Sequence, residues 1–567
     1  MAVDYQAVGN NAQAPFTLKV HRGEGAALLA MDWRTGEPPD AFVGFAIRYQ
    51  PPGGGHFSTV YNRLNFEGAP NPHGYATFPT TAAPIQKFRW VVFPQTAPVV
   101  GPFTFRVTAM MMDGAGMLSE GSTQEATIDL GHETYPGLIN IAFTRGYVAS
   151  QAFVDRFGGA AAIPQLLPAK TDDGLGFVAT HAKAAEAYAW MGFEARQEID
   201  ALLADAIASA TAVSVVAYDL NLPDIVEPLK HLGARLRIII DDNNDDHGEP
   251  TSAETQAATA LAAAGAQVKR QHMGQLQHNK MIVVEGPKPR ALCGSTNFSW
   301  RGFYVQSNNA VLLSGAAAIA PLKAAFEAYW TKTGFADGAA PDWHDLALPG
   351  VAAKISFSPH DAARARLAEI AADIGAAQSS LLYSLAFLYM TSGPVTDAVT
   401  AATQSDLFTY GISDKRTGIV VHKPDGNLAP VYFARLAKNV PPPFKPEPFS
   451  GRGANLHHKF VVIDFDTDDA RVWCGSYNFS PTADTKNGEN LLLIRDRKIA
   501  TAYMVEGIRI VDAYHFRVAQ DEAKKKAAAG TGTSGLALRK PPGPGEQPWW
   551  REDYSDPVKI RDRKLFA

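Results

Sequence analysis

One pattern occurs twice in this chain and restricts its fold more than any other feature. Residues 275–299 read QLQHNKMIVVEGPKPRALCGSTNFS, and residues 455–480 read NLHHKFVVIDFDTDDARVWCGSYNFS. In each copy His-x-Lys precedes four apolar residues, an acidic residue and then Cys-Gly-Ser-x-Asn-Phe-Ser. The offset between copies is 179 residues at the histidine and 181 at the asparagine, because the turn DFDTDDAR is longer than EGPKPR. A repeat of this length is a duplicated half-domain rather than a solenoid unit of about 20–50 residues.

Short strand patterns fill the region from about residue 15 to 131. Segments such as FTLKVHRG and GPFTFRVTAMMMDG alternate apolar and polar residues and are separated by turns rich in glycine and proline. This spacing is typical of a β-sandwich. The second segment resembles the penultimate strand of a fibronectin type III module, which implies an immunoglobulin-like sandwich. Whether this domain binds a ligand or only spaces and caps the rest of the chain stays open.

From about residue 175 onward, helix and strand patterns alternate through both copies of the repeat, and the last strand pattern before the second motif is TGIVVHK, residues 417–423. Alternation of this kind predicts an α/β body built from two halves. Residues after 520 are linker-like in composition and end in PWWREDYSDPVKIRDRKLFA, whose two tryptophans indicate a tail that docks back on the body. We therefore divide the chain into a β-sandwich domain, a connecting segment, a first α/β half, a second α/β half and a C-terminal tail: 1–131, 132–174, 175–345, 346–520 and 521–567.

The composition is that of an ordinary globular protein, with 46% hydrophobic and 19% charged residues in 567. A net charge of −5 provides no overall basic field for a polyanion. This counts against a non-specific nuclease, although a local basic groove can be hidden in such an average. The two cysteines, Cys293 and Cys474, occupy the same place in both copies. We interpret them as buried packing residues and expect no disulfide, no metal site and no other cofactor.

No targeting or membrane-spanning segment is recognisable in the sequence. The first residues, MAVDYQAVGNNAQAPF, lack the charged and apolar regions of a signal peptide. No window reaches the ~18 uninterrupted apolar residues of a spanning helix. The sequence therefore predicts a cytoplasmic protein whose contact with a membrane, if any, is peripheral. Export by a signal-independent route stays open.

The strand pattern separates the polar residues of each copy onto two faces. Because side chains alternate along a strand, the histidine and lysine share one face, and the acidic residue that follows the apolar run points to the other. The acidic residues are Glu285 in the first copy and Asp464 in the second. We therefore interpret both as structural rather than catalytic.

The two copies resemble the signature of the phospholipase D superfamily, His-x-Lys-x4-Asp followed by Gly-Ser-x-Asn. The resemblance is closest over residues 275–313 and 455–494 and extends over the α/β body. It implies two halves that face each other across a pseudo-twofold axis and share one site, so a monomer suffices. The first copy departs from the signature at Glu285. The family also carries an acidic residue 11 positions after the asparagine, which is Glu489 in the second copy but Asn308 in the first.

These residue types suit the cleavage of a phosphodiester. A neutral imidazole is a competent nucleophile near pH 7, and a protonated one is a competent acid for the leaving oxygen. Lysines and amide donors can stabilise the charge that develops around phosphorus without a metal. We predict these catalytic residues: His278, His457, Lys280, Lys459, Asn297, Asn478 and Glu489. The predicted substrate-binding residues are Ser295, Ser476 and Asn308.

The single carboxylate, Glu489, bears on the roles of the two histidines. A nucleophile that becomes cationic benefits most from a carboxylate on its second ring nitrogen. If Glu489 reaches across the twofold axis to His278, and Asn308 holds His457, then His278 is the nucleophile and forms a phosphohistidine. His457 is then the general acid and base. Pairing within the second half would reverse the assignment.

Three classes of function follow from these observations. The first is a metal-independent phosphodiesterase that hydrolyses a phospholipid or transfers its phosphatidyl group to an alcohol. The stretches SLAFLYMTSGPV and PPPFKPEPF are candidate apolar rims for that substrate, or else ordinary core and surface segments. The second is a nuclease or nucleic-acid end-processing enzyme of the same fold, which would need a basic groove. The third, a catalytically silent binding protein, is disfavoured because both histidines, lysines and asparagines are retained.

Overall fold

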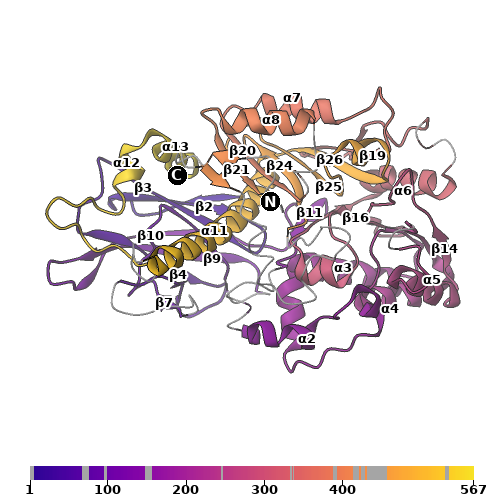
Figure 1. Cartoon of the computed structure of the whole chain (residues 1–567), viewed down its shortest axis with the longest axis horizontal. Coiled ribbons are helices and arrows are strands. Elements are labelled where there is room, and N and C mark those ends of the chain that lie inside the picture. Colours follow the sequence, from indigo (N-terminus) through magenta and orange to yellow (C-terminus); the bar gives the residue numbers. More distant parts are fainter. Residues whose placement is uncertain are drawn as a thin grey trace.

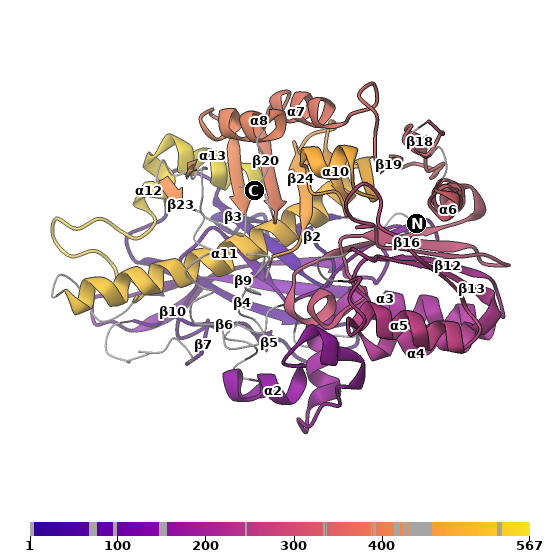
Figure 2. The same ribbon diagram turned by 45° about the vertical axis from the view of Figure 1, so that its right-hand side comes forward.

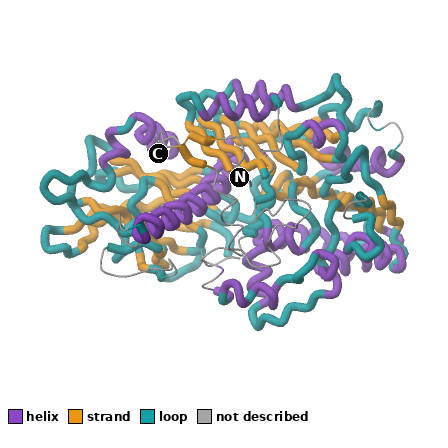
Figure 3. Tube along the Cα trace, viewed as in Figure 1, coloured by secondary structure: helices purple, strands orange, loops and turns teal. Residues whose placement is uncertain are grey.

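The structure is a computed structural model that describes residues 5–66, 76–94, 99–146, 153, 156–243, 247–332, 335, 337–386, 388, 393–412, 420–422, 428–430, 456–529 and 536–567. Within these residues a β-sandwich lies beside two seven-stranded sheets (Figure 1). Helices pack on both faces of the two larger sheets, whereas the N-terminal region consists mostly of strands (Figure 3).

Two four-stranded sheets form the N-terminal sandwich, in the orders β1-β2-β3-β8 and β10-β9-β4-β5. Their bounds are β1 Gln6–Val8, β2 Phe16–Arg22, β3 Ala27–Trp33, β4 Phe42–Gln50, β5 Ser58–Thr59, β8 Arg89–Val92, β9 Pro102–Met112 and β10 Leu118–Asp129, with a ribbon of β6 Tyr61–Asn62 and β7 Phe78–Pro79. In β9, Phe103, Phe105 and Val107 are buried and alternate with partly exposed residues, as the sequence predicts. Phe16 of one sheet meets Phe45 of the other, with ring centroids 5.2 Å apart.

The first α/β half has the strand order β11-β17-β16-β15-β12-β13-β14. Its strands are β11 Ile139–Phe143, β12 Val213–Ala217, β13 Leu236–Ile240, β14 Gln267–Arg270, β15 Met281–Val284, β16 Arg290–Gly294 and β17 Asn309–Ser314. Its helices are α2 Ile163–Leu166, α3 Ala184–Ala208, α4 Pro223–Leu232, α5 Ala253–Ala263 and α6 Ala316–Thr331, with short turns η1 Gly159–Ala161, η2 Thr171–Gly176, η3 Gly233–Arg235 and η4 Arg301–Val305. Strand β11 pairs with β17, so the segment 132–174 supplies an edge strand to this sheet as well as a connection.

The second half repeats this arrangement, with the order β18-β19-β26-β25-β24-β20-β21. Its strands are β18 His344–Asp345, β19 Ala352–Ser358, β20 Ser380–Leu385, β21 Phe408–Ile412, β24 Lys459–Ile463, β25 Arg471–Gly475 and β26 Glu489–Arg495. Its helices are α7 Leu367–Gly375, α8 Pro394–Thr403, α10 Pro481–Thr485 and α11 Arg497–Ala528. In both halves the strand that follows the His-x-Lys motif pairs with a neighbour that begins the parallel part of the sheet.

One predicted strand of the second half forms but does not join the large sheet. The pattern TGIVVHK, residues 417–423, suggests the strand that follows α8 in the sheet. That strand is instead β21, which pairs in parallel with β20. The predicted segment contains β22 (Val420–His422), which pairs with β23 (Leu428–Pro430) in a separate ribbon.

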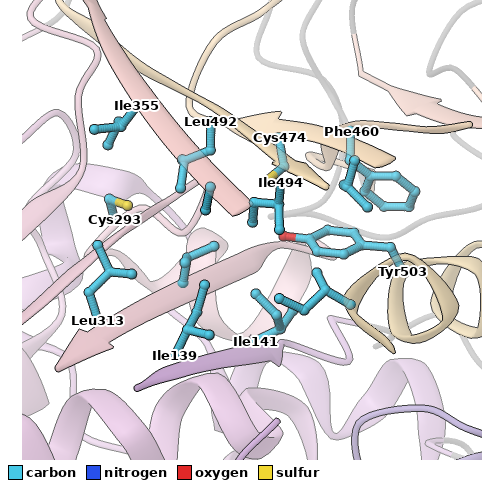
Figure 4. Packing of buried hydrophobic residues seen from close by; sticks show 14 of the residues in the cluster. Ile139, Ile141, Cys293, Leu313, Ile355, Phe460, Cys474, Leu492, Ile494 and Tyr503 are labelled. Carbon is cyan, nitrogen blue, oxygen red and sulfur yellow. The ribbon is translucent and has the colours of Figure 1, made fainter. Parts of the chain in front are cut away.

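The inner faces of the two large sheets pack against each other. Figure 4 shows Ile139 and Leu313 of the first half on one side of this core and Leu492 of the second half on the other. Cys293 and Cys474 lie in the same core as free thiols, and both are fully buried. Burial raises the pKa of both thiols. The interpretation of the cysteines as packing residues is therefore confirmed.

The C-terminal tail docks on the sandwich. It contains the helices α12 (Arg551–Ser555) and α13 (Pro557–Phe566). Trp550 is 3% exposed in the sandwich core, and Trp549 stacks on Phe88 with centroids 5.3 Å apart. Helix α11 leaves the second half and runs alongside the sandwich before the tail begins (Figures 1 and 2). Among the described residues, no helix combines the length and apolar character needed to cross a membrane.

Candidate active site

The two His-x-Lys motifs meet where the halves face each other. His278 precedes β15 and His457 precedes β24, so each histidine stands at the start of a central strand. Their imidazole centroids lie 6.3 Å apart at an interplanar angle of 67°, although 179 residues separate them in sequence. The rings are 4% and 5% exposed. The structure thus brings the two predicted histidines into one nearly buried site.

Each histidine is held by a residue from the opposite half. His278 Nδ1 lies 2.8 Å from Glu489 Oε2, and His457 Nδ1 lies 2.8 Å from Asn308 Oδ1. Glu489 begins β26, and Asn308 directly precedes β17, the corresponding strand of the first half. The sequence left two alternatives open, pairing across the halves or within the second half. The structure has the crossed pairing.

Two serines support these partners. Ser476 Oγ donates to Glu489 Oε2 at 2.7 Å, and Ser295 Oγ donates to Asn308 Oδ1 at 3.0 Å. Both serines are fully buried. The Asn308 amide nitrogen donates to a backbone carbonyl, so both ends of this amide are engaged. These contacts favour a positioning role for the three residues over the direct contact with substrate that the sequence suggested.

The charges around the two rings differ. Burial lowers the pKa of His457 well below its ordinary value, and the neighbouring Lys459 and Lys280 ammonium groups lower it further. Burial raises the pKa of the Glu489 carboxyl to about 7, against the opposing effects of Lys280 and the Ser476 hydroxyl. The His278 ring therefore adjoins a group that can carry negative charge, whereas His457 adjoins a neutral amide.

Both motif lysines are buried beside their histidines. Lys280 Nζ donates to the His278 carbonyl, and Lys459 Nζ donates to the His457 carbonyl at 2.9 Å. The Lys280 ammonium also lies 4.8 Å from the ring centroid of Tyr218. Burial lowers the pKa of Lys280 to about 8, and Glu489 partly opposes this shift. Two basic side chains thus lie within the site beside the histidines.

The Gly-Ser-x-Asn segments form tight turns at the ends of β16 and β25. Gly294 has a φ of 137°, and a Cβ there would lie 2.6 Å from a backbone carbonyl oxygen, so the turn requires glycine. Asn297 Nδ2 donates to Asp219 Oδ2 at 2.6 Å. Asn478 is partly exposed, whereas Asn297 is buried, and the amide oxygen of each has no hydrogen-bond partner among the described residues. The two predicted asparagines therefore differ in their surroundings.

The acidic residues at the strand ends point away from the histidines, as the alternation of side chains predicts. Asp464 accepts the backbone N–H groups of Gln378 and Ser379 at 2.8 Å and pairs with Arg471 at 3.3 Å. Glu285 pairs with Lys323 at the surface. Both contacts are structural.

A cluster of acidic residues and a histidine, which the sequence analysis did not identify, lies near the motifs. Ligand atoms of Asp219, His247 and Glu254 lie within 4.8 Å of one another beside Asn297. The sequence carried a usable signal, because Asp219 and Asp241 each follow one of two adjacent parallel strands, β12 and β13. Residues at the carboxyl ends of neighbouring parallel strands gather at one edge of a sheet.

The candidate apolar rims are only partly described. In SLAFLYMTSGPV, residues 384–395, positions 387 and 389–392 lie outside the described residues. All of PPPFKPEPF, residues 441–449, lies outside them as well. Both rims stay predictions.

Comparison with known proteins matches both halves to one family. The family described as cardiolipin synthase, PLD-like domain, matches residues 203–330 and 370–508. A 48-residue stretch is 44% identical to a phospholipase D of Rickettsia prowazekii and 40% identical to one of Rickettsia felis. Each match covers 8% of this chain and 22% of the relative, so it spans about a fifth of the length of these proteins.

Solved structures that match this chain in part include a phospholipase D family member, NUC, from Salmonella typhimurium. It has 24% identity and a TM-score of 0.21, over 24% of this chain and 87% of that one. Phosphatidylserine synthase of Haemophilus influenzae has 12% identity and a TM-score of 0.36, over 55% of this chain and 84% of that one. The family match to both halves supports placing this chain in the phospholipase D superfamily, which its two repeated motifs resemble.

Proposed function

We propose that this protein cleaves a phospholipid phosphodiester without a metal, using His278 as nucleophile and His457 as general acid and base. The observation that carries the assignment is the 2.8 Å contact between His278 Nδ1 and Glu489 of the opposite half. A carboxylate on Nδ1 fixes the tautomer and stabilises the positive charge that the ring gains when Nε2 bonds to phosphorus. The Asn308 amide on His457 supplies no such charge.

The first step forms a bond between His278 Nε2 and phosphorus and breaks the bond from phosphorus to the leaving oxygen. His457 donates a proton from Nε2 to that oxygen. Its lowered pKa makes the protonated ring a strong acid, and the negative charge of a bound phosphate favours protonation before the step. In the second step His457 accepts a proton from water or an alcohol, which attacks phosphorus and releases His278.

Lys280, Lys459, Asn297 and Asn478 are the proposed electrostatic clamp. Both ammonium groups are buried beside the histidines, where charge interactions are stronger than in water. Both ammonium groups stabilise the negative charge that develops on the pentavalent phosphorus in both steps. This is the work that a divalent ion performs in other phosphodiesterases.

A phospholipid is the preferred substrate on two grounds. The family that matches both halves is described as cardiolipin synthase, PLD-like domain, and the curated relatives are named phospholipase D. The net charge of −5 offers no general attraction for nucleic acid. We propose that hydrolysis and transfer differ only in whether water or an alcohol reaches the phosphohistidine, and that membrane contact is peripheral.

The test is turnover of labelled phospholipid vesicles beside labelled single-stranded and double-stranded DNA, with excess chelator and without added metal. We expect phospholipid to be cleaved and the rate to be insensitive to chelator, while a His278→Ala variant is inactive on every substrate. Faster cleavage of DNA would make the protein a nuclease of the same fold. Loss of activity on chelation, restored by one divalent ion, would refute metal independence.

A further inference from the structure

A third histidine lies beside the site, and the mechanism above does not use it. His247 is 7% exposed. Its Nδ1 lies 2.9 Å from Asp241 Oδ2, and its Nε2 lies 3.3 Å from Asp219 Oδ1 and 3.9 Å from Glu254 Oε1. Three carboxyl groups therefore surround one buried ring. A cluster of this composition is stabilised when the ring carries a positive charge.

The two aspartates connect this ring to the reactive residues. Asp219 Oδ2 accepts the Asn297 amide at 2.6 Å. Asp241 is fully buried and accepts the backbone N–H of Gln277, the residue before His278, at 2.6 Å. His247 thus bridges the Gly-Ser-x-Asn turn and the His-x-Lys motif of the first half.

The position of the ring is fixed from several elements. The Tyr218 ring contacts both His247 and His278, with centroids 4.5 Å and 4.7 Å away. Arg270 and Ser252 donate to the His247 carbonyl at 2.6 Å and 2.7 Å. Contacts from the residue after β12, from β14 and from the N-cap of α5 therefore fix the ring and the backbone of His247.

The second half lacks a corresponding carboxylate in its sequence. The pairing of β12 with β15 and of β20 with β24 aligns Asp219 with Phe387. Aspartate can carry a negative charge and phenylalanine cannot, so of these two aligned positions only Asp219 can place a negative charge near the proposed phosphate position. Asp219 keeps 21% of its side chain exposed, so it is not removed from that site by burial.

We propose that His247 is a positioning residue which, as an imidazolium between Asp241 and Asp219, cancels the charge of Asp219 so that this carboxylate orients Asn297 without repelling the phosphate. The inference rests on the proposed function. Without the imidazolium, Asp219 would compete with the phosphate for Lys280 and weaken anion binding. Two unit charges about 4 Å apart near a protein surface interact strongly enough to change the affinity for phosphate on the order of tenfold.

A divalent cation is the rival explanation for the same cluster. The separations from His247 Nε2 to the two carboxyl groups would suit ligands of one ion. A proton is favoured because Asp219 is already committed to Asn297, and Glu254 accepts the Leu220 backbone N–H at 3.0 Å. The experiment must therefore separate a proton from a metal.

The experiment compares the wild type with His247→Gln, Asp219→Asn and the double variant. Binding of inorganic phosphate is measured by calorimetry, and turnover of bis(p-nitrophenyl) phosphate gives kcat and KM. We expect His247→Gln to weaken phosphate binding and raise KM on the order of tenfold, with a smaller change in kcat. The double variant regains most of this loss, because an asparagine at position 219 still accepts from Asn297 but carries no charge.

If His247 has a purely structural role, His247→Gln should weaken phosphate binding equally in the wild type and in Asp219→Asn. That result would overturn the inference. Stoichiometric divalent metal in the wild type that is absent from His247→Gln would overturn it as well. If His247→Gln does not fold, the double variant is compared with Asp219→Asn, and the two must bind phosphate within about twofold of each other. Phosphate binding with the expected pattern but no diester turnover would refute the proposed function and leave this inference standing.

Discussion

At the scale of single residues, the two histidines differ in what holds the second ring nitrogen. Glu489 can stabilise a cationic ring, whereas Asn308 can only orient a neutral or protonated one. The pKa of His457 is lowered by burial and by two lysines, so this ring loses its proton readily. The difference in charge between the partners therefore favours the proposal that the two otherwise similar motifs perform distinct steps.

The first prediction tests that assignment. A His457→Ala variant given a p-nitrophenyl diester, whose leaving group needs no acid, is expected to accumulate phosphohistidine at His278. The adduct persists because water attack on it lacks a base. Peptide mass spectrometry at neutral or alkaline pH locates the modification. An adduct at His457 in the wild type would instead make that ring the nucleophile.

The second prediction contrasts two charged residues of the first motif. Lys280→Ala is expected to lower kcat on the order of 10³-fold, because it removes a buried cation beside the phosphorus. Glu285→Gln breaks only a surface pair with Lys323, worth at most about 1 kcal/mol, and is expected to keep its activity. Steady-state kinetics and thermal unfolding of both variants check this. A folded but inactive Glu285→Gln would contradict the structural reading of Glu285.

Residues of the repeated motifs, together with Glu489 and Asn308 at a fixed spacing after them, could be placed in the site from the sequence, whereas Asp219 and His247 outside the motifs were missed. The duplication marks His278 and His457 together with their lysines and asparagines, and the structure brings both histidines into one site. Asp219 and His247 have no repeated motif around them, and their contacts join separate segments of the first half. The position of Asp219 after a predicted strand was a usable signal, but the contact of His247 with it is seen only in the fold.

At the scale of elements, periodicity predicted most strands of the α/β body but not which strands pair. The segments FTYGI and GIVVH both read as short apolar strands, and the first of them joins the sheet as β21. Likewise β11 lies in a segment rich in glycine and proline, where its pairing with β17 is decided by contacts distant in sequence. Pairing depends on tertiary context that a local pattern does not contain.

The third prediction concerns the C-terminal tail. Trp550 is buried in the sandwich core with apolar residues of both sheets. Trp550→Ala is expected to cost about 3–5 kcal/mol of unfolding free energy through the cavity that it leaves. Tyr61→Ala, at a residue that is 50% exposed, serves as the control and should change little. Chemical denaturation followed by fluorescence measures both, and equal stability of the two variants would show that the tail contributes little.

The fourth prediction concerns pH and the same docking surface. His21 is buried, its Nε2 lies 2.6 Å from the Phe566 carbonyl oxygen, and burial lowers its pKa to about 4. The folded state therefore favours the neutral ring, and unfolding takes up a proton between pH 6.5 and 4. The free energy of unfolding is unaffected by titration of this ring above pH 6.5, the pKa of the unfolded histidine. It falls by up to about 3 kcal/mol as the pH decreases from 6.5 to 4.

A His21→Gln variant isolates this effect, because a glutamine cannot titrate there. The advantage of the wild type over the variant is expected to shrink as the pH is lowered from 6.5 to 4. Denaturation midpoints at several pH values measure the difference. A difference that is constant across this range would show that His21 does not gain a proton on unfolding.

At the scale of the whole molecule, the site exists only because two halves of one chain face each other. Glu489 holds His278 and Asn308 holds His457, so each half completes the histidine of the other. The apolar core between the two sheets contains buried residues from both and keeps these contacts in register. Linking both halves in a single chain removes the concentration dependence that a dimeric site would have.

The last prediction follows from this intramolecular arrangement. Specific activity is expected to be independent of protein concentration, and a mixture of His278→Ala and His457→Ala chains is expected to stay inactive. If the site formed between two chains, mixing would pair an intact first half with an intact second half and restore part of the activity. Within one chain every site carries one of the two defects, so no combination is complete. Kinetics across a wide range of protein concentrations, with sedimentation at the same concentrations and phospholipid turnover of the mixture after overnight incubation, distinguish the two arrangements. Recovered turnover would mean that halves from different chains associate.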